Sequence, residues 1–270
     1  MRCARALLAA GCLVTCAAAA QDPGVVADVP YLASPQIVVD EMLRLAQVGP
    51  RDIVYDLGSG DGRVVITAAA KFGARSVGIE IDAAMARLAR DNVARAGLAE
   101  RVRIVQQDLF ATDLEEATVI TLYLAPYLNL RLRERLLGLR PGTRIVSHSS
   151  DMGEWQPDLK TAVRKDVLLW YVPARVEGYW QARLPEGVME IDFRQSFQRI
   201  AGQARLAGKP ASVWEARLRG EELEFVLSDT DGEKALYFAG RVGTQAIEGT
   251  VSRDVGARRQ VDAWRATRAR

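Results

Sequence analysis

A turn with glycine at every second position is the part of this sequence that points most directly to ligand chemistry. It runs Asp56-Leu57-Gly58-Ser59-Gly60-Asp61-Gly62. Glycine permits backbone dihedrals that other residues avoid and lets a ligand approach the main chain closely. The first N–H groups of the helix expected to follow are free donors at a positive dipole end. Asp56, beside the turn, is a poor neighbour for a pyrophosphate but suits a ligand that carries positive charge.

Two familiar nucleotide-binding motifs do not fit this turn. A Walker-type phosphate loop requires Gly-Lys-Ser/Thr, which does not follow here. A dinucleotide fingerprint requires Gly-x-Gly-x-x-Gly, whereas the third residue after Gly60 is Arg63. S-adenosylmethionine, which carries a cationic sulfonium and an ammonium group, fits both the glycines and Asp56.

Carboxylates at the ends of the next two predicted strands agree with this cofactor. Glu80 can accept hydrogen bonds from both ribose hydroxyls. Asp108 can accept one from an adenine amino group, with apolar residues after it as cover for the ring. The alternative is that both residues are surface loop acids. The predicted cofactor-binding residues are Asp56, Gly58, Ser59, Gly60, Gly62, Glu80, Gln107, Asp108 and Leu109.

Short apolar runs alternate with helix-compatible stretches around these motifs. Strands are predicted at 53–57, 76–81, 102–106, 119–124 and 143–148, and helices at 35–47, 63–72, 83–96 and 129–139. This alternation predicts an α/β fold with a Rossmann-like, doubly wound and mainly parallel sheet. Because such sheets bind ligands beyond the carboxyl ends of their strands, the motifs should meet at one edge. Ser34, just before Pro35, is expected to cap the first helix.

The pattern changes near residue 173 to strands in which polar and apolar residues alternate. Ile191, Phe193 and Phe197 should share one face of such a strand. Turn residues separate roughly seven or eight short strands, which predicts a smaller antiparallel, barrel-like all-β domain. Its tryptophans, Trp180, Trp214 and Trp264, are expected in the core. This domain either recognises a partner or apolar ligand, or stabilises the rest of the chain.

The first twenty residues predict an export signal. Arg2 and Arg5 precede an apolar run of small residues that ends at Ala20. The run is too short for a membrane-spanning helix, and Thr15 before Cys16 makes a lipoprotein signal the poorer interpretation. We therefore expect an exported, periplasmic protein, or a cytoplasmic one if the signal is not used. The predicted domains are a signal peptide at 1–20, a connector with the first helix at 21–50, a cofactor domain at 51–173 and a β-rich domain at 174–270.

Composition narrows the partners and the metal chemistry. The chain has 36 Lys and Arg against 34 Asp and Glu, and loss of Arg2 and Arg5 would balance them. Because the charges balance, we expect no nucleic-acid partner. We also expect no transmembrane helix in the mature chain. All three cysteines lie in the first sixteen residues, so a processed chain has no disulfide and no cysteine metal site. A single histidine also speaks against a metal site.

The motifs resemble those of class I methyltransferases. Val54-Tyr55-Asp56-Leu57-Gly58-Ser59-Gly60 is similar to the Dot1-like enzymes and to the small lysine methyltransferases that modify mitochondrial ATP synthase subunit c and the adenine nucleotide translocase. Two further stretches favour the second group: Val29-Pro30-Tyr31-Leu32-Ala33-Ser34-Pro35 and Thr121-Leu122-Tyr123-Leu124-Ala125-Pro126. The resemblance covers about residues 29–158. A long basic nucleosome-binding extension of the Dot1 type is missing, which puts a histone substrate in doubt.

The resemblance implies methyl transfer from S-adenosylmethionine to an amine, such as a protein lysine. Tyr123 would lie near the transferred methyl group, and Tyr31 would close the site if the first helix covers the cofactor; for both, ordinary packing is the alternative. His148, at the end of the fifth strand, can take a proton from the amine or order the loop that follows. Two other functions stay open at this point: a small-molecule methyltransferase, and a non-catalytic exported binding protein on the same scaffold.

Overall fold

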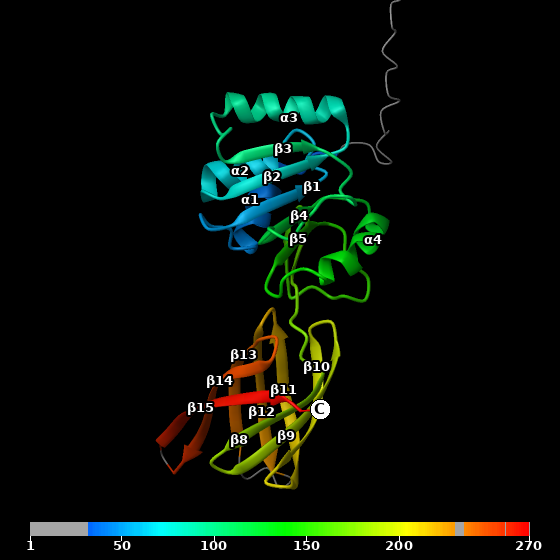
Figure 1. The fold of residues 1–270 in the computed structure, drawn as a ribbon. Helices are drawn as coiled ribbons and strands as arrows, with labels where there is room; N and C mark the ends of the chain where they lie inside the picture. Colours follow the sequence, from blue (N-terminus) through cyan, green and yellow to red (C-terminus); the bar gives the residue numbers. More distant parts are fainter. Residues whose placement is uncertain (1–31, 230–234, 257, 270) are drawn as a thin grey trace, which may run out of the picture.

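The computed structural model describes residues 32–229, 235–256 and 258–269, which form a mixed α/β part followed by a β-barrel (Figure 1). The predicted signal peptide and Tyr31 lie outside the described residues. The helices are α1 (Gln36–Leu45), α2 (Arg63–Phe72), α3 (Ala83–Arg95) and α4 (Pro126–Leu137). The strands of the first part are β1 (Ile53–Leu57), β2 (Arg75–Glu80), β3 (Val102–Gln106), β4 (Val119–Leu122), β5 (Arg144–His148), β6 (Leu159–Val163) and β7 (Lys165–Tyr171). The barrel strands are β8 (Gly178–Leu184), β9 (Gly187–Ser196), β10 (Arg199–Leu206), β11 (Lys209–Arg219), β12 (Glu222–Asp229), β13 (Ala235–Val242), β14 (Ala246–Val255) and β15 (Arg258–Arg268).

The first part is a seven-stranded sheet of order β3-β2-β1-β4-β5-β7-β6. Strands β1 to β5 pair in parallel, so their carboxyl ends lie on one edge. Helices α1, α2 and α3 cover one face of the sheet, where one cluster of buried residues joins α1 and α2 to the strands and another joins α2 and α3. Helix α4 packs on the opposite face in a third cluster. The predicted doubly wound, mainly parallel sheet is confirmed, and all five predicted strands form within one or two residues of their expected bounds.

The sequence analysis did not predict two of the strands. Strand β7 pairs antiparallel with β5, and β6 pairs antiparallel with β7 at the edge of the sheet. The apolar run of β7 is buried from Val167 to Trp170, but it follows an exposed β6 with no helix between them. A prediction based on alternating strands and helices does not find this hairpin, because no helix separates its two strands.

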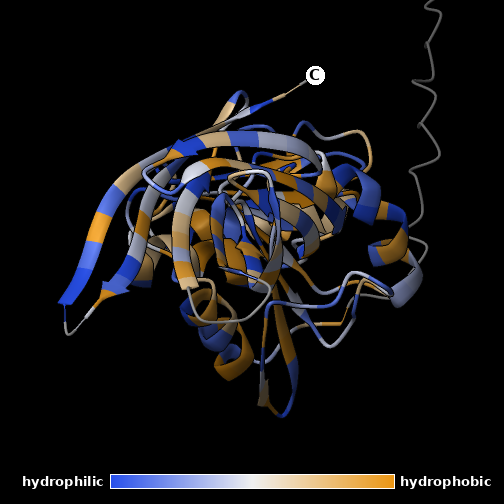
Figure 2. Ribbon diagram, turned by 90° about the horizontal axis from the view of Figure 1, so that it is seen from below, coloured by the Kyte–Doolittle hydropathy of each residue, from blue (hydrophilic) through white to orange (hydrophobic). Residues whose placement is uncertain are grey.

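The second part is a closed antiparallel barrel of order β10-β11-β12-β13-β14-β15-β8-β9, which confirms the predicted barrel-like domain. Hydrophobic and hydrophilic residues alternate along its strands (Figure 2), and the inward set forms one core that includes Phe225, Phe238 and Trp264. Closure between β8 and β15 rests on three residue pairs, from Ala182 opposite Ala266 to Trp180 opposite Arg268.

Two aromatic residues lie elsewhere than expected. Trp180 and Trp264 are buried in the barrel, but Trp214 is 59% exposed on its outer surface. Trp214 precedes a register shift in β11, and this irregularity turns its side chain outward, where its indole N–H donates to Ser228. Phe197 does not share the inner face of Phe193, because it occupies the β9–β10 turn with a φ of 56°.

The barrel contacts the first part of the chain at two places. Near the amino end of β5, the amide of Ala174 donates to the carbonyl of Gly220, and a Cβ on Gly220 would stand 2.9 Å from Cα of Gly142. On the face of the sheet that α4 covers, the ring of Phe197 stacks on Trp155 at 6.2 Å between centroids. Phe197 thereby joins the core of the sheet rather than that of the barrel.

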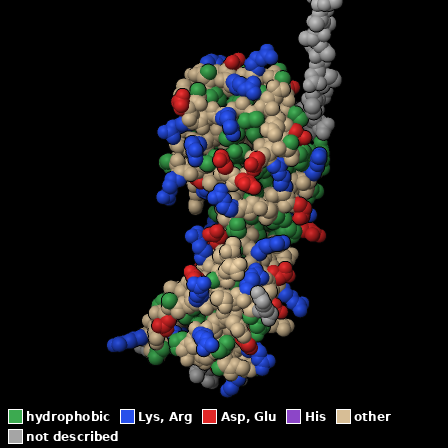
Figure 3. All heavy atoms as spheres, viewed as in Figure 1, with side chains coloured by type: hydrophobic (Ala, Val, Ile, Leu, Met, Phe, Trp, Pro, Cys, Tyr) green, Lys and Arg blue, Asp and Glu red, His purple; other side chains and the backbone are tan. Residues whose placement is uncertain are grey.

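Charges of both signs are interspersed on the face shown in Figure 3, in line with the near-neutral composition. Within the described residues, no helix has the length and apolar character needed to cross a membrane.

Candidate functional site

The predicted site residues from β1 to β5 meet at the carboxyl edge of the sheet. The glycine turn follows β1, Glu80 ends β2, and Gln107 and Asp108 follow β3. Tyr123 follows β4, and His148 ends β5. Parallel pairing brings these segments together although they are separated in sequence.

The glycine turn takes the backbone conformation that its sequence predicts. Gly58, Gly60 and Gly62 have φ angles of 83°, 54° and 82°, in the left-handed region where a side chain is strained. The amides of Gly58 and Ser59 both donate to the carbonyl of Ile79, which fastens the turn to β2. The amides of Gly60 and Gly62 also have acceptors within the protein, Glu80 and the Ser59 carbonyl, so this glycine cradle can offer a ligand its carbonyls. A Cβ at Gly58 would meet Leu124 at 3.0 Å.

Gly78 in β2 is required by the close approach of this turn. A Cβ at that position would lie 2.4 Å from Oγ of Ser59 and 2.8 Å from Cδ1 of Ile104. We predict that Gly78→Ala lowers the free energy of unfolding by about 2 kcal/mol, as overpacking of a core does, and weakens binding of S-adenosylmethionine because Ser59 must move. Urea unfolding and calorimetric titration measure the two effects. Gly49→Ala, at a glycine with nothing within 4 Å of its Cβ position and no positive φ, should leave stability and cofactor binding unchanged, whereas equal losses in both variants would contradict the prediction.

Asp56 is the dominant electrostatic feature of the site. It is 5% exposed and sits between β2 and β4, where the Thr121 hydroxyl donates to it at 2.5 Å. Burial raises the pKa of Asp56 to about 7, while the Thr121 and Ser59 hydroxyls lower it in part. The Ser59 hydroxyl makes no hydrogen bond of good geometry within the described residues. A buried carboxylate and an unsatisfied hydroxyl beside a glycine cradle fit a cationic, hydrogen-bonding ligand such as S-adenosylmethionine.

Glu80 ties β2 to the glycine turn. One carboxylate oxygen accepts from the amide of Gly60 at 2.8 Å, and the other accepts from the amide of Asp82 at 2.9 Å. Each oxygen of a carboxylate has a second lone pair, so Glu80 retains acceptor capacity for ribose hydroxyls while it holds the turn.

The loop after β3 is held by α4. Gln107 and Asp108 are exposed, and one oxygen of Asp108 accepts from the amide of Phe110. Arg135 donates to the carbonyls of Leu109 and Phe110, at 2.9 Å each. A second α4 arginine stacks on the Phe110 ring, so one face of that ring is already covered.

The ends of β4 and β5 carry a stacked pair of rings. Tyr123 and His148 lie 4.1 Å apart between centroids, with 27° between their planes. His148 is 2% exposed. Burial lowers the pKa of His148, and the charge of Lys165 lowers it further.

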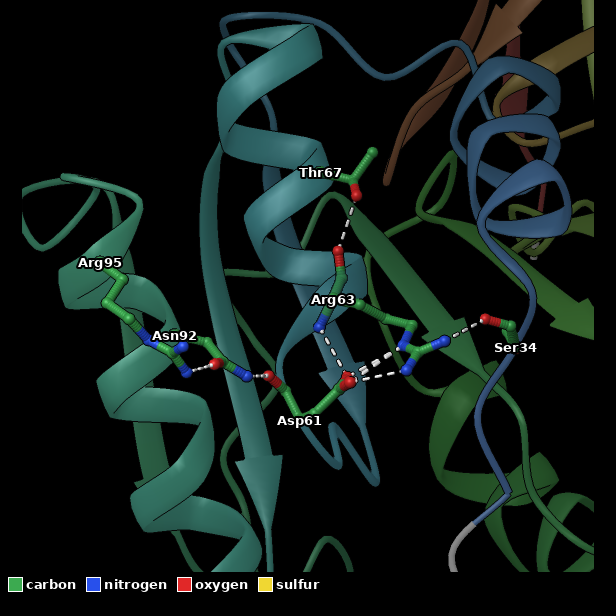
Figure 4. Close-up of polar contacts among 6 residues, drawn as sticks. All are labelled: Ser34, Asp61, Arg63, Thr67, Asn92 and Arg95. Carbon is green, nitrogen blue, oxygen red and sulfur yellow. Dashed lines mark hydrogen bonds and ion pairs between the residues drawn. The ribbon is translucent and has the colours of Figure 1, made fainter.

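Arg63 joins the glycine turn to the segment before α1 (Figure 4). Its guanidinium forms an ion pair with Asp61 at 2.6 Å and donates to the Ser34 carbonyl at 2.9 Å. The Ser34 hydroxyl lies 2.8 Å from Nδ1 of His148. Ser34 therefore does not cap α1: the N-cap residue is Pro35, without a side-chain hydrogen bond, because the hydroxyl is used across the site instead.

The sequence analysis missed two buried polar residues that support this edge. Thr121 holds Asp56, as described above. Asn129 of α4 is fully buried and donates to the hydroxyl of Ser147 and the carbonyl of Ser150, which fixes the loop after β5. A polar residue at a core-facing position of a predicted helix was the only available signal for Asn129.

Comparisons with known proteins agree on the first half of the chain. A family described as the ANTKMT methyltransferase domain matches residues 56–159. A protein-lysine N-methyltransferase of Saccharolobus islandicus (strain REY15A) is 44% identical over 131 residues, which cover 48% of this chain and 81% of that protein. The adenine nucleotide translocase lysine N-methyltransferase of Mus musculus is 35% identical over 131 residues, and the match spans 56% of its length.

A solved structure matches over a similar share of this chain. It is described as an RNA methyltransferase from Salinibacter ruber in complex with S-adenosyl-L-homocysteine, and it has 50% sequence identity and a TM-score of 0.53. The match covers 54% of this chain and 96% of that one.

Proposed function

Since this chain belongs to the family of S-adenosylmethionine-dependent methyltransferases that contains the protein-lysine N-methyltransferase of Saccharolobus islandicus, we propose that it methylates the amino group of a lysine side chain in a protein. The observation that carries the proposal is the buried Asp56 beside a glycine cradle, because this pairing suits the positive charge of the cofactor.

The proposed cofactor site uses the residues along the carboxyl edge. Asp56, the Ser59 hydroxyl and the main-chain carbonyls of Gly58, Gly60 and Gly62 would hold the amino-acid end, because the amides of these glycines already bond within the protein. Glu80 accepts from the ribose. Gln107, Asp108 and Leu109 surround the adenine. When bound, S-adenosylmethionine supplies an electrophilic methyl group, and the protein supplies position.

Transfer requires a neutral amine in line with the methyl group. In this proposal Tyr123 bounds the acceptor side and excludes water there, since it follows β4 next to the glycine turn. The charged form of an incoming lysine is disfavoured by burial at such a site, because desolvation lowers the pKa of an ammonium. The roles of Tyr31 and of an N-terminal export signal remain predictions, as both lie outside the described residues.

The protein acceptor is supported by the names of two relatives, and the name of the Salinibacter ruber structure favours RNA as the second candidate. The balanced charge of this chain supports the protein acceptor. The β-barrel is then the part proposed to recognise the acceptor or a partner.

A labelling experiment tests the proposed function. Purified protein is first titrated with S-adenosylmethionine by calorimetry, and we expect saturable binding. It is then incubated with cofactor carrying a radioactive methyl group and a lysate from cells that lack the protein. We expect label in a protease-sensitive, ribonuclease-resistant fraction, and methyl-lysine after hydrolysis.

The outcomes separate the alternatives. Absence of cofactor binding would reject every methyltransferase function. Label that ribonuclease removes would establish RNA as the acceptor, and label in small molecules would establish a metabolite. Fractionation of the native cells tests the predicted export, because a periplasmic protein leaves the cells on osmotic shock.

A further inference from the structure

The segment before α1 connects the cofactor side of the site to its acceptor side through one residue, Ser34. Its carbonyl accepts from Arg63, which Asp61 of the glycine turn orients (Figure 4). Its hydroxyl contacts Nδ1 of His148. Ser34 is 5% exposed, so both interactions lie away from bulk water and hold more firmly than surface contacts.

His148 is held on two sides. Ser34 occupies one ring nitrogen, and the ring of Tyr123 lies against its face at 4.1 Å. The strand that carries His148 is itself fixed by pairing with β7, where His148 lies opposite Val167. Tyr123, by contrast, follows the last residue of β4 and is partly exposed. The histidine is therefore the fixed member of the stacked pair, and the tyrosine is the member that needs support.

We infer that His148 is a positioning residue: held by Ser34, and through Ser34 by Arg63 of the glycine turn, it fixes the ring of Tyr123 at the acceptor side of the cofactor. This role deepens the proposed methyltransferase function and rests on it. It differs from that of a general base, because positioning requires the shape and the held orientation of the ring but no proton transfer.

The shape requirement gives a test by substitution. His148→Ala removes the ring, and we expect the rate of methyl transfer to fall roughly 10- to 100-fold, as misplacement of a reacting partner does. His148→Phe alone would leave the buried Ser34 hydroxyl without its partner and so destabilise the fold. In the double variant Ser34→Ala, His148→Phe, an aromatic ring still packs against Tyr123 but its hydrogen bond to residue 34 is gone. We therefore expect a rate between that of His148→Ala and that of the original, clearly above His148→Ala. A general base would instead make this double variant as slow as His148→Ala.

Cofactor affinity distinguishes a failed inference from a failed proposed function. Calorimetric titration of His148→Ala with S-adenosylmethionine should give a Kd within roughly threefold of the parent protein, since His148 lies on the acceptor side. If the parent neither binds cofactor nor labels a lysate, the proposed function fails. If the parent labels and the double variant is as slow as His148→Ala, only the inference fails.

A third readout needs no activity. His148 is the only histidine of the sequence, so the NMR signals of its imidazole are unambiguous. We expect Ser34→Ala to shift them, and Arg63→Gln to shift them as well, because Arg63 acts through Ser34. The matched control is Gln36→Ala at the start of α1, since the Gln36 side chain donates to Asp40 and Thr67. Signals that Ser34→Ala leaves unchanged would overturn the inference.

Discussion

Asp56→Asn is expected to weaken the binding of S-adenosylmethionine roughly 30-fold or more, since a hydrogen bond or ion pair to a charged group contributes about 2 kcal/mol. Asparagine keeps the shape of the side chain and can still accept from the Thr121 hydroxyl, so the fold of the apoprotein should persist. Calorimetric titration at pH 8 measures the loss. Binding as tight as that of the parent would contradict the role of Asp56 as the counter-charge of the cofactor.

The pH dependence of the same variant provides its control. The pKa of Asp56 is about 7 in the folded protein, above that of an exposed aspartate. Between about pH 4 and pH 7 the folded state thus holds a proton that the unfolded state has released, and the contribution of Asp56 to stability decreases as the pH rises. Asp56→Asn lacks this dependence, so its stability relative to the parent should increase across that window. Cofactor binding by the parent should tighten as the pH rises through about 7, while binding by the variant stays nearly constant.

Phe197→Ala is expected to reduce the free energy of unfolding by about 2–3 kcal/mol and to reduce methyl transfer. This value lies at or just below the lower end of the usual range for a buried phenylalanine, because the ring is only partly buried. The ring belongs to the barrel chain but covers the fully buried Trp155, next to the loop that follows His148. Its loss should therefore change the fluorescence of Trp155 and loosen the acceptor side from a distance.

Trp214→Ala is the matched control for this prediction. Trp214 is a larger aromatic residue of the same barrel, but it is 59% exposed and is not part of the buried core of the barrel or of the sheet. Its replacement should change stability by less than about 0.5 kcal/mol. If both variants lose the same stability, Phe197 is an ordinary barrel residue and does not join the two parts.

Much of the cofactor side could be predicted from the sequence because its determinants are local. The positive φ angles of Gly58, Gly60 and Gly62 follow from residue type and spacing within seven positions. The placement of Glu80 follows from one strand end and one parallel pairing. Periodicity and turn chemistry are enough to recognise such features.

The proposed acceptor side depends on contacts between distant segments, which a single sequence does not contain. Ser34 looks like a helix cap next to Pro35, yet its hydroxyl bonds to His148, 114 positions away. Phe197 follows the alternation of an inward strand residue but leaves the barrel at a turn. In both cases the local pattern was sound, and tertiary packing offered the side chain a better partner.

The narrow closure of the barrel has a consequence for the order in which the chain folds. The three pairs that join β8 to β15 link strands at opposite ends of the barrel sequence, so this seam has the highest loop-closure cost in the domain. During synthesis β8 must wait for seven further strands to emerge, while the α/β sheet is already complete. The amide hydrogens that bond across this seam should accordingly exchange with solvent sooner than those that bond between β8 and β9, which form a local hairpin.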